Sequence, residues 1–278
     1  MFNDQEEGPT RAAGEAPANP RIELRQDVTI EEVTETLKNL PKGKALSLDG
    51  IPNEVLKALS PEIAEGLARA ISGAFASGTL PGRYKESVTI VIRKESKKDY
   101  SLPGSYRPIA LENTLAKVVE KILATRLSRA AEEHGLLPWT QMGARKQRST
   151  MSAIGLLTSC VQTAWRAKPG SVVSMLSLDL AGAFDNVPHD KLLEILRRKK
   201  LPEWITRIIA SFMRGRRTRI AYTGFESDWI ETGAGIPQGS PLSPILFLFF
   251  ISGLLEKFQD PETGTLGLSF VDDINLIT

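Results

Sequence analysis

The chain has 278 residues, of which 41% are hydrophobic and 24% charged, and its formal net charge is +2. This length suggests one large domain or two subdomains, with enough apolar residues for a core. One cysteine (Cys160) and two histidines exclude a disulfide partner and a Cys/His zinc site, so a bound metal would need oxygen ligands, as magnesium or manganese does.

Charge is distributed unevenly along the chain. Residues 1–28 are acidic and lack the apolar core of a signal peptide, so we predict a disordered N-terminal segment there. Between Lys191 and Arg219, ten basic residues stand against two acidic ones. That excess indicates a surface for a polyanion, although a solvent-exposed helix face explains it equally well. The longest apolar run, 245–255, is too short to span a bilayer, so we expect a soluble intracellular protein with no membrane partner.

The first half of the chain predicts helices with a small sheet. Thr29 and Glu32 are spaced as a capping box, which starts a helix. Apolar residues at helical intervals form one face of it: Ile30, Val33, Leu37 and Leu40. A loop at 41–52 precedes a helix from Ser60 to Gly78, then a strand at 88–92 and a long helix that spans 115–127.

The second half gives a clearer order of elements. A strand over 172–180 comes first, followed by helices at 190–199 and 203–213 and strands at 217–222 and 229–232. A Gly/Pro loop, "GAGIPQGSP", leads into a helix from about Pro241 to Phe258, and a β-hairpin ends the sequence. This order predicts an α+β fold in which helices back an antiparallel sheet.

The terminal hairpin, "LGLSFVDDINLIT", places Asp272 and Asp273 at its turn. Aspartate is common in turns, so this pair alone has an ordinary structural explanation. Two carboxylates beside apolar runs nevertheless repel each other and lose hydration, which a divalent cation would offset. The pair therefore raises the question of a further carboxylate and a phosphate-binding apparatus.

Asp179 is the candidate for that further carboxylate. It ends a strand whose other face carries Leu176, Leu178 and Leu180, so its side chain should project from the open face of the sheet, although an aspartate at a strand end also serves as a cap. If the terminal hairpin pairs beside this strand, the carboxylates meet across the sheet. We expect Asp272 as the main shared ligand and Asp273 as an auxiliary one. Such carboxylates suit two-metal phosphoryl transfer.

A triphosphate substrate would also need cations, and the first half of the chain offers Lys94 and Arg107. Arginine presents a bidentate fork to phosphate, and lysine a mobile point charge. Each is equally well explained as a surface cation.

Three segments resemble the palm motifs of reverse transcriptases: "LSLDLAGAFDNV" (176–187), "GIPQGSPLSPILF" (235–247) and "SFVDD" (269–273). Two upstream segments, "YRPIAL" (106–111) and "QMGARKQRSTMSAI" (141–154), resemble the fingers motifs of non-LTR (LINE-type) retrotransposon enzymes, with wording closest to fungal elements. The resemblance covers about Thr29 to the end, and five motifs in order make it specific.

The resemblance implies a role for each matching residue. Asp179, Asp272 and Asp273 would form the catalytic metal site with the Leu180 carbonyl, holding Mg²⁺ or Mn²⁺. Phe184 would be a steric gate against a 2′-hydroxyl, although alone it has the character of a core aromatic residue. Gln238 would contact the incoming nucleotide, where Gly239 allows close backbone approach. The remaining residues would track the template backbone: Arg145, Arg148 and Ser149.

The resemblance also implies an organisation and a function. We expect a fingers-like region at 29–172 and a palm at 173–278 that ends soon after the Asp-Asp hairpin, before a thumb. The expected function is an RNA-directed DNA polymerase that uses an RNA template, a DNA primer and dNTPs, in the nucleus or cytoplasm. The alternative is a truncated, inactive remnant that retains at most nucleic-acid binding. "GKALSLDG" (43–50) and "RK" (93–94) depart from the usual family wording.

Overall fold

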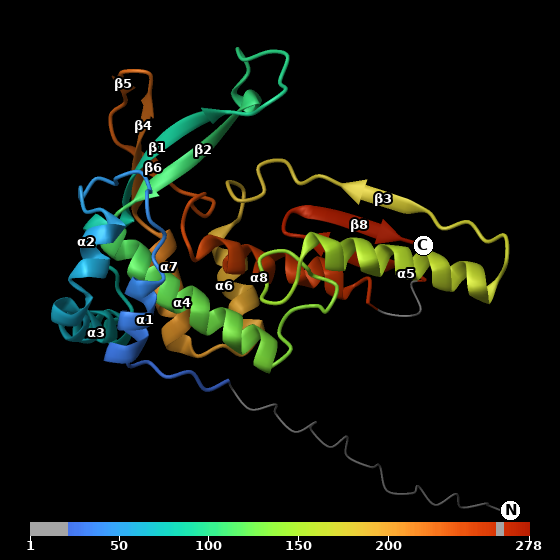
Figure 1. Ribbon diagram of the computed structural model, residues 1–278, viewed down its shortest axis with the longest axis horizontal. Helices are drawn as coiled ribbons and strands as arrows, with labels where there is room; N and C mark the ends of the chain where they lie inside the picture. Colours follow the sequence, from blue (N-terminus) through green and yellow to red (C-terminus); the bar gives the residue numbers. More distant parts are fainter. Residues whose placement is uncertain (1–21, 260–263) are drawn as a thin grey trace, which may run out of the picture.

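The computed structural model describes residues 22–259 and 264–278, which form helices packed around two separate β-sheets (Figure 1). The described helices are α1 (Ile30–Lys38), α2 (Asn53–Ala58), α3 (Ser60–Ser77), α4 (Thr114–Glu133), α5 (Thr150–Ala167), α6 (His189–Arg198), α7 (Glu203–Met213) and α8 (Ser243–Glu256), with 3₁₀ turns η1 (Gly82–Lys85) and η2 (Pro103–Ser105). The described strands are β1 (Glu86–Arg93), β2 (Tyr106–Glu112), β3 (Met175–Leu178), β4 (Arg216–Tyr222), β5 (Phe225–Glu226), β6 (Ile230–Thr232), β7 (Leu266–Phe270) and β8 (Asp273–Ile277). The predicted α+β class is confirmed.

Five strands form the first sheet, in the order β2-β1-β4-β5 with β6 also paired to β4. All its pairs are antiparallel except β1 with β4, which is parallel. β1 and β2 rise as a hairpin away from the helices (Figure 1). The second sheet is antiparallel, in the order β3-β8-β7. It lies between α8 and α5, because Gly267 of β7 approaches the side chains of α8 and α5 contacts β7 from the other face.

The sheets do not follow the predicted boundary at residues 172 and 173. β4 belongs to the predicted palm region, yet it pairs with β1 of the predicted fingers region. Conversely, Gln141 forms an isolated parallel bridge with Ser269 of β7. The two predicted regions therefore share backbone hydrogen bonds at both sheets.

The first helix begins as the sequence predicts. The Thr29 side chain accepts a hydrogen bond from the Glu32 amide at 3.2 Å, and Val33 and Leu37 are fully buried. Ile30 is 45% exposed, so its place in the predicted buried face is wrong. It borders a groove between the start of α1 and α3, which leaves one side of its side chain open.

Residues 22–28 correct the prediction of a disordered segment over 1–28. Ile22 and Val28 are buried, and the Leu24 carbonyl accepts a hydrogen bond from Trp204 of α7. The Arg126 guanidinium donates to the carbonyls of Arg25 and Asp27. These contacts hold the segment in place. Their partners lie far along the chain, so the local composition does not reveal them. Residues 1–21 lie outside the described part of the chain.

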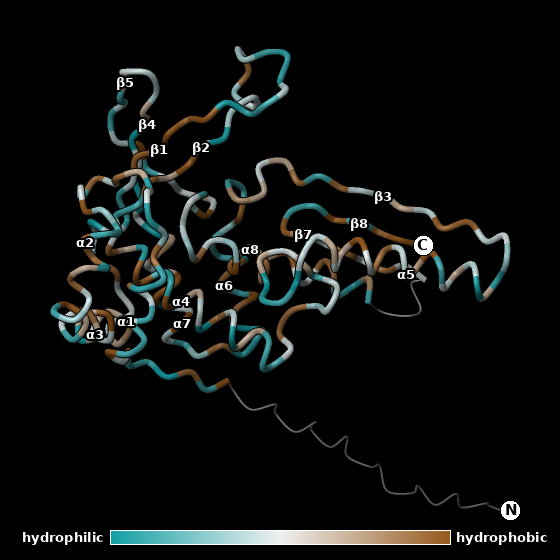
Figure 2. The backbone as a smooth tube through the Cα atoms, viewed as in Figure 1, coloured by the Kyte–Doolittle hydropathy of each residue, from teal (hydrophilic) through white to brown (hydrophobic). Residues whose placement is uncertain are grey.

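The later helices supply much of the core. The predicted helices at 190–199, 203–213 and 241–258 are confirmed as α6, α7 and α8 with small changes at their ends. α8 is apolar on all sides and almost wholly buried, as expected for a helix that packs against several neighbours. Hydrophobic residues also concentrate along β1 and β8 (Figure 2). No helix among residues 22–259 and 264–278 is both long and apolar enough to cross a membrane.

Some elements were missed or only partly predicted from the sequence. β2 contains Pro108, which cannot donate to a sheet ladder and so argues against a strand. α5 was not predicted, although an apolar stripe at helical spacing is half-buried along one of its faces: Ala153, Leu156, Leu157, Cys160, Val161 and Ala164. The strand predicted over 172–180 shrinks to β3, where Leu176 and Leu178 are 57% and 36% exposed because β3 is an edge strand.

The two faces of α1 give a test of this packing. We expect Leu37→Ala to lower the free energy of unfolding by about 2–5 kcal/mol, because it opens a cavity in the core. Ile30→Ala in the same helix should change it by about 0.5 kcal/mol or less. Urea unfolding followed by circular dichroism measures both, and equal losses would contradict the described burial of α1.

Candidate active site

The terminal hairpin does pair beside the strand that precedes Asp179. β3 and β8 are antiparallel partners, and the last pair of their ladder is Leu178 with Ile274. One further step in that register sets Asp179 across from Asp273. The hydroxyl of Ser177 donates to the side chain of Asn275 at 2.6 Å, so these neighbouring positions do share a face. The strands therefore pair as this prediction requires, while the meeting of the carboxylates themselves stays a prediction.

The register reverses the expected order of Asp272 and Asp273. Phe270 pairs with Asp273, so the turn consists of Val271 and Asp272, and Asp273 is the first residue of β8. Asp273, which we expected as the auxiliary ligand, is thus the one across from Asp179, because the two-residue turn places Asp272 outside the ladder. Within residues 22–259 and 264–278, no three carboxylate, imidazole or thiol groups are close enough together to hold a metal ion. The donors fit magnesium in chemical type, as oxygen ligands on neighbouring strands and a turn.

The segment at 140–143 packs against the hairpin beside the turn formed by Val271 and Asp272. The Met142 amide donates to the Ser269 carbonyl at 2.8 Å, and the Ser269 amide donates to Thr140 at 3.2 Å. A Cβ on Gly143 would lie 2.5 Å from the Val271 side chain, so only glycine allows this approach. Residues of the predicted fingers motif therefore fix the position of the turn that carries Asp272.

The loop at 233–241 docks on the segment that follows Asp179. The Gly235 amide donates to the Val187 carbonyl at 3.1 Å, and the Ile236 amide donates to Phe184 at 2.9 Å. Gly235 has φ +79°, and a Cβ there would lie 2.5 Å from the Asp185 carbonyl oxygen. This contact sets the loop directly against the segment 184–187.

The same loop also docks on β2. The Ala110 amide donates to the Gln238 carbonyl at 2.7 Å. Gly239 has φ +124°, and a Cβ on it would lie 2.5 Å from the Ala110 carbonyl oxygen. In this structure the backbone close to Gly239 is that of β2, and its approach to a nucleotide stays a prediction.

Gln238 lines a cavity of about 240 Å³ between the loop and the first sheet. Its amide donates to both carboxylate oxygens of Asp185, each at 3.1 Å. Asp185 lines the same cavity, although its place in the sequence is explained equally well by a simple cap. Its partner Gln238 is 53 residues away, so only the folded chain brings the two together.

Phe184 lies half-buried beside these residues. Its ring stacks on that of Phe247 in α8, with centroids 4.9 Å apart and planes at 19°. Phe184 therefore has the contacts of a core aromatic residue on one side. Its role as a steric gate stays a prediction.

Lys94 and Arg107 lie on the hairpin of the first sheet, at the end that rises away from the helices. Lys94 follows β1 and donates to the Gly104 carbonyl at 3.1 Å, and Arg107 of β2 pairs with Ile92. The aspartates belong to the other sheet. Among the described residues, no hydrogen bond or ion pair joins these two cations to the aspartates.

The residues predicted to bind the template, Arg145, Arg148 and Ser149, have partners within the protein. Arg145 has a side chain only 4% exposed and forms an ion pair with Glu132 at 2.7 Å, while also donating to the Pro138 and Gln141 carbonyls. Its contact with a template stays a prediction and would require it to leave these partners. Burial and the neighbouring Arg145 charge lower the pKa of Arg148, which donates to the Trp139 carbonyl. Ser149 is the N-cap of α5.

The basic run between Lys191 and Arg219 is largely paired within the protein. Seven of its ten cations form ion pairs with carboxylates. These partners come mostly from outside the run, such as Glu86 for Arg217 and Glu256 for Lys199. The charge available to a polyanion is therefore smaller than the sequence count implies.

Comparisons with known proteins agree with the resemblance. The family model described as reverse transcriptase (RNA-dependent DNA polymerase) matches residues 92–278, more than half of the chain. The probable RNA-directed DNA polymerase from transposon BS of Drosophila melanogaster is 31% identical over 254 residues, which is 90% of this chain and 28% of that protein. A retrovirus-related Pol polyprotein from type-1 retrotransposable element R2 of Nasonia vitripennis is 32% identical over 72% of this chain and 19% of its own length. The chain thus spans less than a third of these relatives.

Similar structures support the fold. An apo telomerase from Candida tropicalis, truncated from its C-terminal domain, aligns with a TM-score of 0.52 over 82% of this chain and 49% of that one. The sequence identity is 17%, so the likeness concerns the fold alone.

Gly239 gives a test of how the loop docks. We expect Gly239→Ala to lower the free energy of unfolding by roughly 1–3 kcal/mol, because alanine at φ +124° is strained and its Cβ meets the Ala110 carbonyl. Gly233→Ala is the matched control, since a Cβ there has no neighbour within 4 Å. Chemical denaturation measures both variants. A Gly239→Ala protein as stable as the control would show that the loop does not sit against β2.

Proposed function

This chain belongs to the reverse transcriptase (RNA-dependent DNA polymerase) family, and we propose that it forms the fingers and palm of a non-LTR retrotransposon polymerase. The observation that supports this most is the pairing of β3, which directly precedes Asp179, with β8, which begins at Asp273 after the turn with Asp272. The proposed reaction is nucleotidyl transfer from a dNTP to the 3′-hydroxyl of a DNA primer on an RNA template.

The proposed metal ligands are the carboxylates of Asp179, Asp272 and Asp273 with the Leu180 carbonyl. Magnesium suits this all-oxygen set, and manganese is the alternative. Such an ion, when bound, lowers the pKa of the attacking hydroxyl and neutralises charge on the leaving pyrophosphate. The proposed role of the protein is to hold these carboxylates at the ends of paired strands and at their turn before the substrates arrive.

The proposed nucleotide site lies around Gln238, Asp185 and Phe184. The hydrogen bonds from Gln238 to Asp185 hold the Gln238 amide at the cavity, where it would contact the incoming nucleotide. The Phe184 ring, held against Phe247, would exclude a ribose 2′-hydroxyl. Lys94 and Arg107 would approach the triphosphate from the β1–β2 hairpin, and Arg148 with Ser149 would follow the template.

The carboxylates give the first test of this function. We expect Asp179→Asn to reduce primer extension on an RNA template by roughly 10²–10³-fold, because the loss of a fixed charge removes transition-state stabilisation. Asp190→Asn is the matched control, since its side chain is 91% exposed and it pairs with Arg214 on the surface. Single-nucleotide incorporation with magnesium measures the rate for each protein.

Binding separates an enzyme from an inactive remnant. Asp179→Asn should still bind primer-template with an affinity that falls as salt rises, since phosphate contacts dominate binding. An unsubstituted chain that binds in this way but incorporates no nucleotide would instead support the remnant.

Phe184 gives a test of sugar selection. We expect Phe184→Val to raise the incorporation of ribonucleotides relative to deoxyribonucleotides by roughly tenfold or more, because the smaller side chain leaves room for a 2′-hydroxyl. Phe250→Val serves as the control, because Phe250 also borders Phe247, with centroids 6.3 Å apart. Competition between the two nucleotides in primer extension measures the ratio. An unchanged ratio in Phe184→Val would assign Phe184 to the core only.

A further inference from the structure

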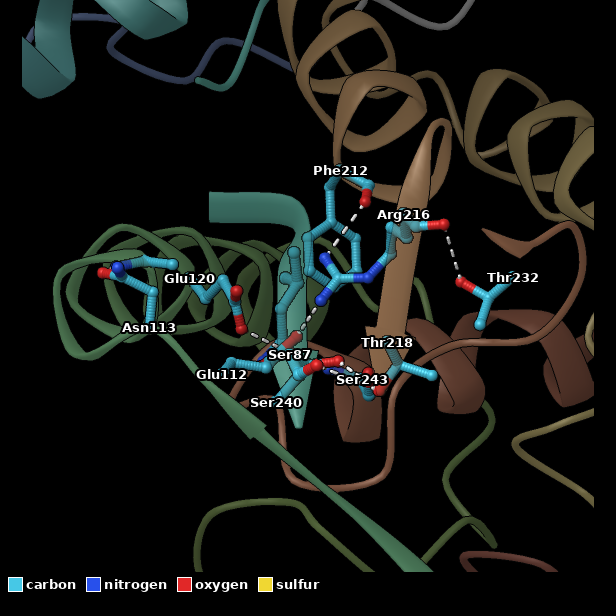
Figure 3. A network of polar contacts seen from close by, with 12 residues as sticks. Ser87, Glu112, Asn113, Glu120, Phe212, Arg216, Thr218, Thr232, Ser240 and Ser243 are labelled. Atoms are coloured by element: carbon cyan, nitrogen blue, oxygen red, sulfur yellow. Dashed lines mark hydrogen bonds and ion pairs between the residues drawn. The ribbon is translucent and has the colours of Figure 1, made fainter. Parts of the chain in front are cut away.

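Two buried glutamates and a buried arginine lie behind the loop that carries Gln238. Glu112 ends β2, Glu120 belongs to α4 and Arg216 begins β4, and none is more than 4% exposed. Arg216 forms an ion pair with Glu112 and donates to the Phe212 carbonyl at 3.2 Å. The Ser240 hydroxyl reaches Glu120 from the loop at 2.5 Å. Figure 3 shows these side chains converging from four separate elements.

The direction of the Ser240 hydrogen bond follows from its other partners. Its oxygen accepts from the amides of Leu242 at 3.0 Å and Ser243 at 3.3 Å, which occupies its two lone pairs. Its single proton is therefore donated to Glu120. Through this bond Glu120 fixes both the end of the loop and the first turn of α8.

The oxygens of the two glutamates require one proton between them. Oε2 of Glu112 and Oε1 of Glu120 are buried and have no donor among the described side chains and backbone groups. A proton on Glu120 supplies one, because the carboxyl then donates to Glu112. Without it, the site holds two carboxylates and one guanidinium in the interior, an excess negative charge that burial makes costly.

The charges around Glu120 agree with placing the proton on its carboxyl group. Burial and the neighbouring Glu112 charge raise the pKa of Glu120 well above its usual value, against the opposing effect of Arg216. Burial also raises the pKa of Glu112, but Arg216, Lys117 and the hydrogen bond to Glu120 act to lower it. Lys85 of η1 lies near Arg216 as well, and burial lowers its pKa. Glu112 is therefore the ionised partner of Arg216, and Glu120 is the neutral one.

We propose that Glu120 is a positioning residue of the proposed nucleotide site: as a neutral acid held against the Glu112–Arg216 ion pair, it anchors Ser240 and so fixes the loop that carries Gln238. This inference rests on the proposed function, because Gln238 contacts a nucleotide only if that function holds. Arg216 itself lines the cavity beside Gln238 and Asp185, which joins the buried network to the site. Glu120 touches no substrate and acts through Ser240.

If the proton lies on Glu120, substitution of the two glutamates should have different effects on stability. In Glu120→Gln the amide N–H replaces the acid proton and its oxygen still accepts from Ser240, so we expect a melting temperature within about 2 °C of the parent. Glu112→Gln leaves the Arg216 guanidinium without its counter-ion, and should lower the melting temperature by roughly 10 °C. Equal losses in the two variants would overturn the assignment of the proton to Glu120.

The pH dependence of stability tests the same proton independently. A folded pKa above the ordinary 4.5 means that this contribution to stability is full below pH 4.5 and is lost as the pH rises through the folded pKa. We expect the melting temperature of the parent to fall more than that of Glu120→Gln as the pH rises above 4.5, because glutamine cannot ionise. Glu133→Gln, at the exposed end of α4, should keep the parent profile. Superimposable profiles for the parent and Glu120→Gln would overturn the proposal.

Amide hydrogen exchange tests whether Glu120 holds the loop. We expect Glu120→Ala and Ser240→Ala to speed exchange across residues 235–243 at least tenfold, and Glu120→Gln to restore protection. Ser252→Ala is the matched control, because Ser252 is equally buried in α8 but donates only to the Phe249 carbonyl of its own helix. Exchange in Glu120→Ala no faster than in Ser252→Ala would leave Glu120 a purely structural residue and refute the positioning role.

Kinetics connect the loop to the proposed function. Glu120→Ala should raise the KM for dNTP about tenfold with a smaller change in kcat, and Glu120→Gln should restore it. A chain without polymerase activity would refute the proposed function, whereas the exchange and melting experiments would still decide whether Glu120 holds the loop. A kcat loss without a KM change would contradict positioning of the nucleotide.

Discussion

The arrangement of the site depends on the contacts that the loop at 233–241 makes. The loop meets the chain at three places: the segment 184–187, the β2 backbone at Ala110, and the buried carboxyl of Glu120. At Gly235 and Gly239 the backbones are so close that any side chain would collide. Because each contact comes from a different element, the loop fixes the first sheet, α4 and the segment 184–187 relative to one another.

The two predicted regions of the chain are further joined by segments that pair with strands of the other region. β4 leaves the predicted palm region to pair with β1, and residues 140–142 leave the predicted fingers region to bond with β7. Each pairing satisfies backbone hydrogen-bonding groups of both segments that take part in it. The result is that the turn with Asp272 and the loop with Gln238 are both supported by residues from the other half of the chain.

Charges in this protein serve different purposes according to their burial. Most cations of the basic run form ion pairs near the surface, which contribute little individually to stability. The Glu112–Arg216 pair is buried, so losing one partner would leave an uncompensated charge in the interior. Neither arrangement could be read from charge counts, because a count does not distinguish a paired cation from a free one.

The sequence by itself determined the elements with strong periodicity and the motif residues. The N-cap at Thr29, the helices α6 to α8 and the terminal hairpin follow from local spacing, whereas the Glu32 carboxylate of the predicted capping box pairs with Arg126 instead. Asp179, Gln238 and Gly239 could be singled out because their motifs are contiguous. β2 was not predicted because it contains a proline, whereas α5 was missed although its apolar residues recur at helical intervals.

Only the tertiary structure decided which of these residues meet. The register of β3 on β8 selected Asp273 rather than Asp272 as the residue across from Asp179. Asp185 belongs to the site because it binds Gln238, which is 53 residues away in the chain. Glu120 is linked to it through Ser240, which is 120 residues away. Long-range hydrogen bonds of this kind depend on how sheets and helices pack, and packing is settled by burial and shape over the whole chain rather than by the spacing of neighbours.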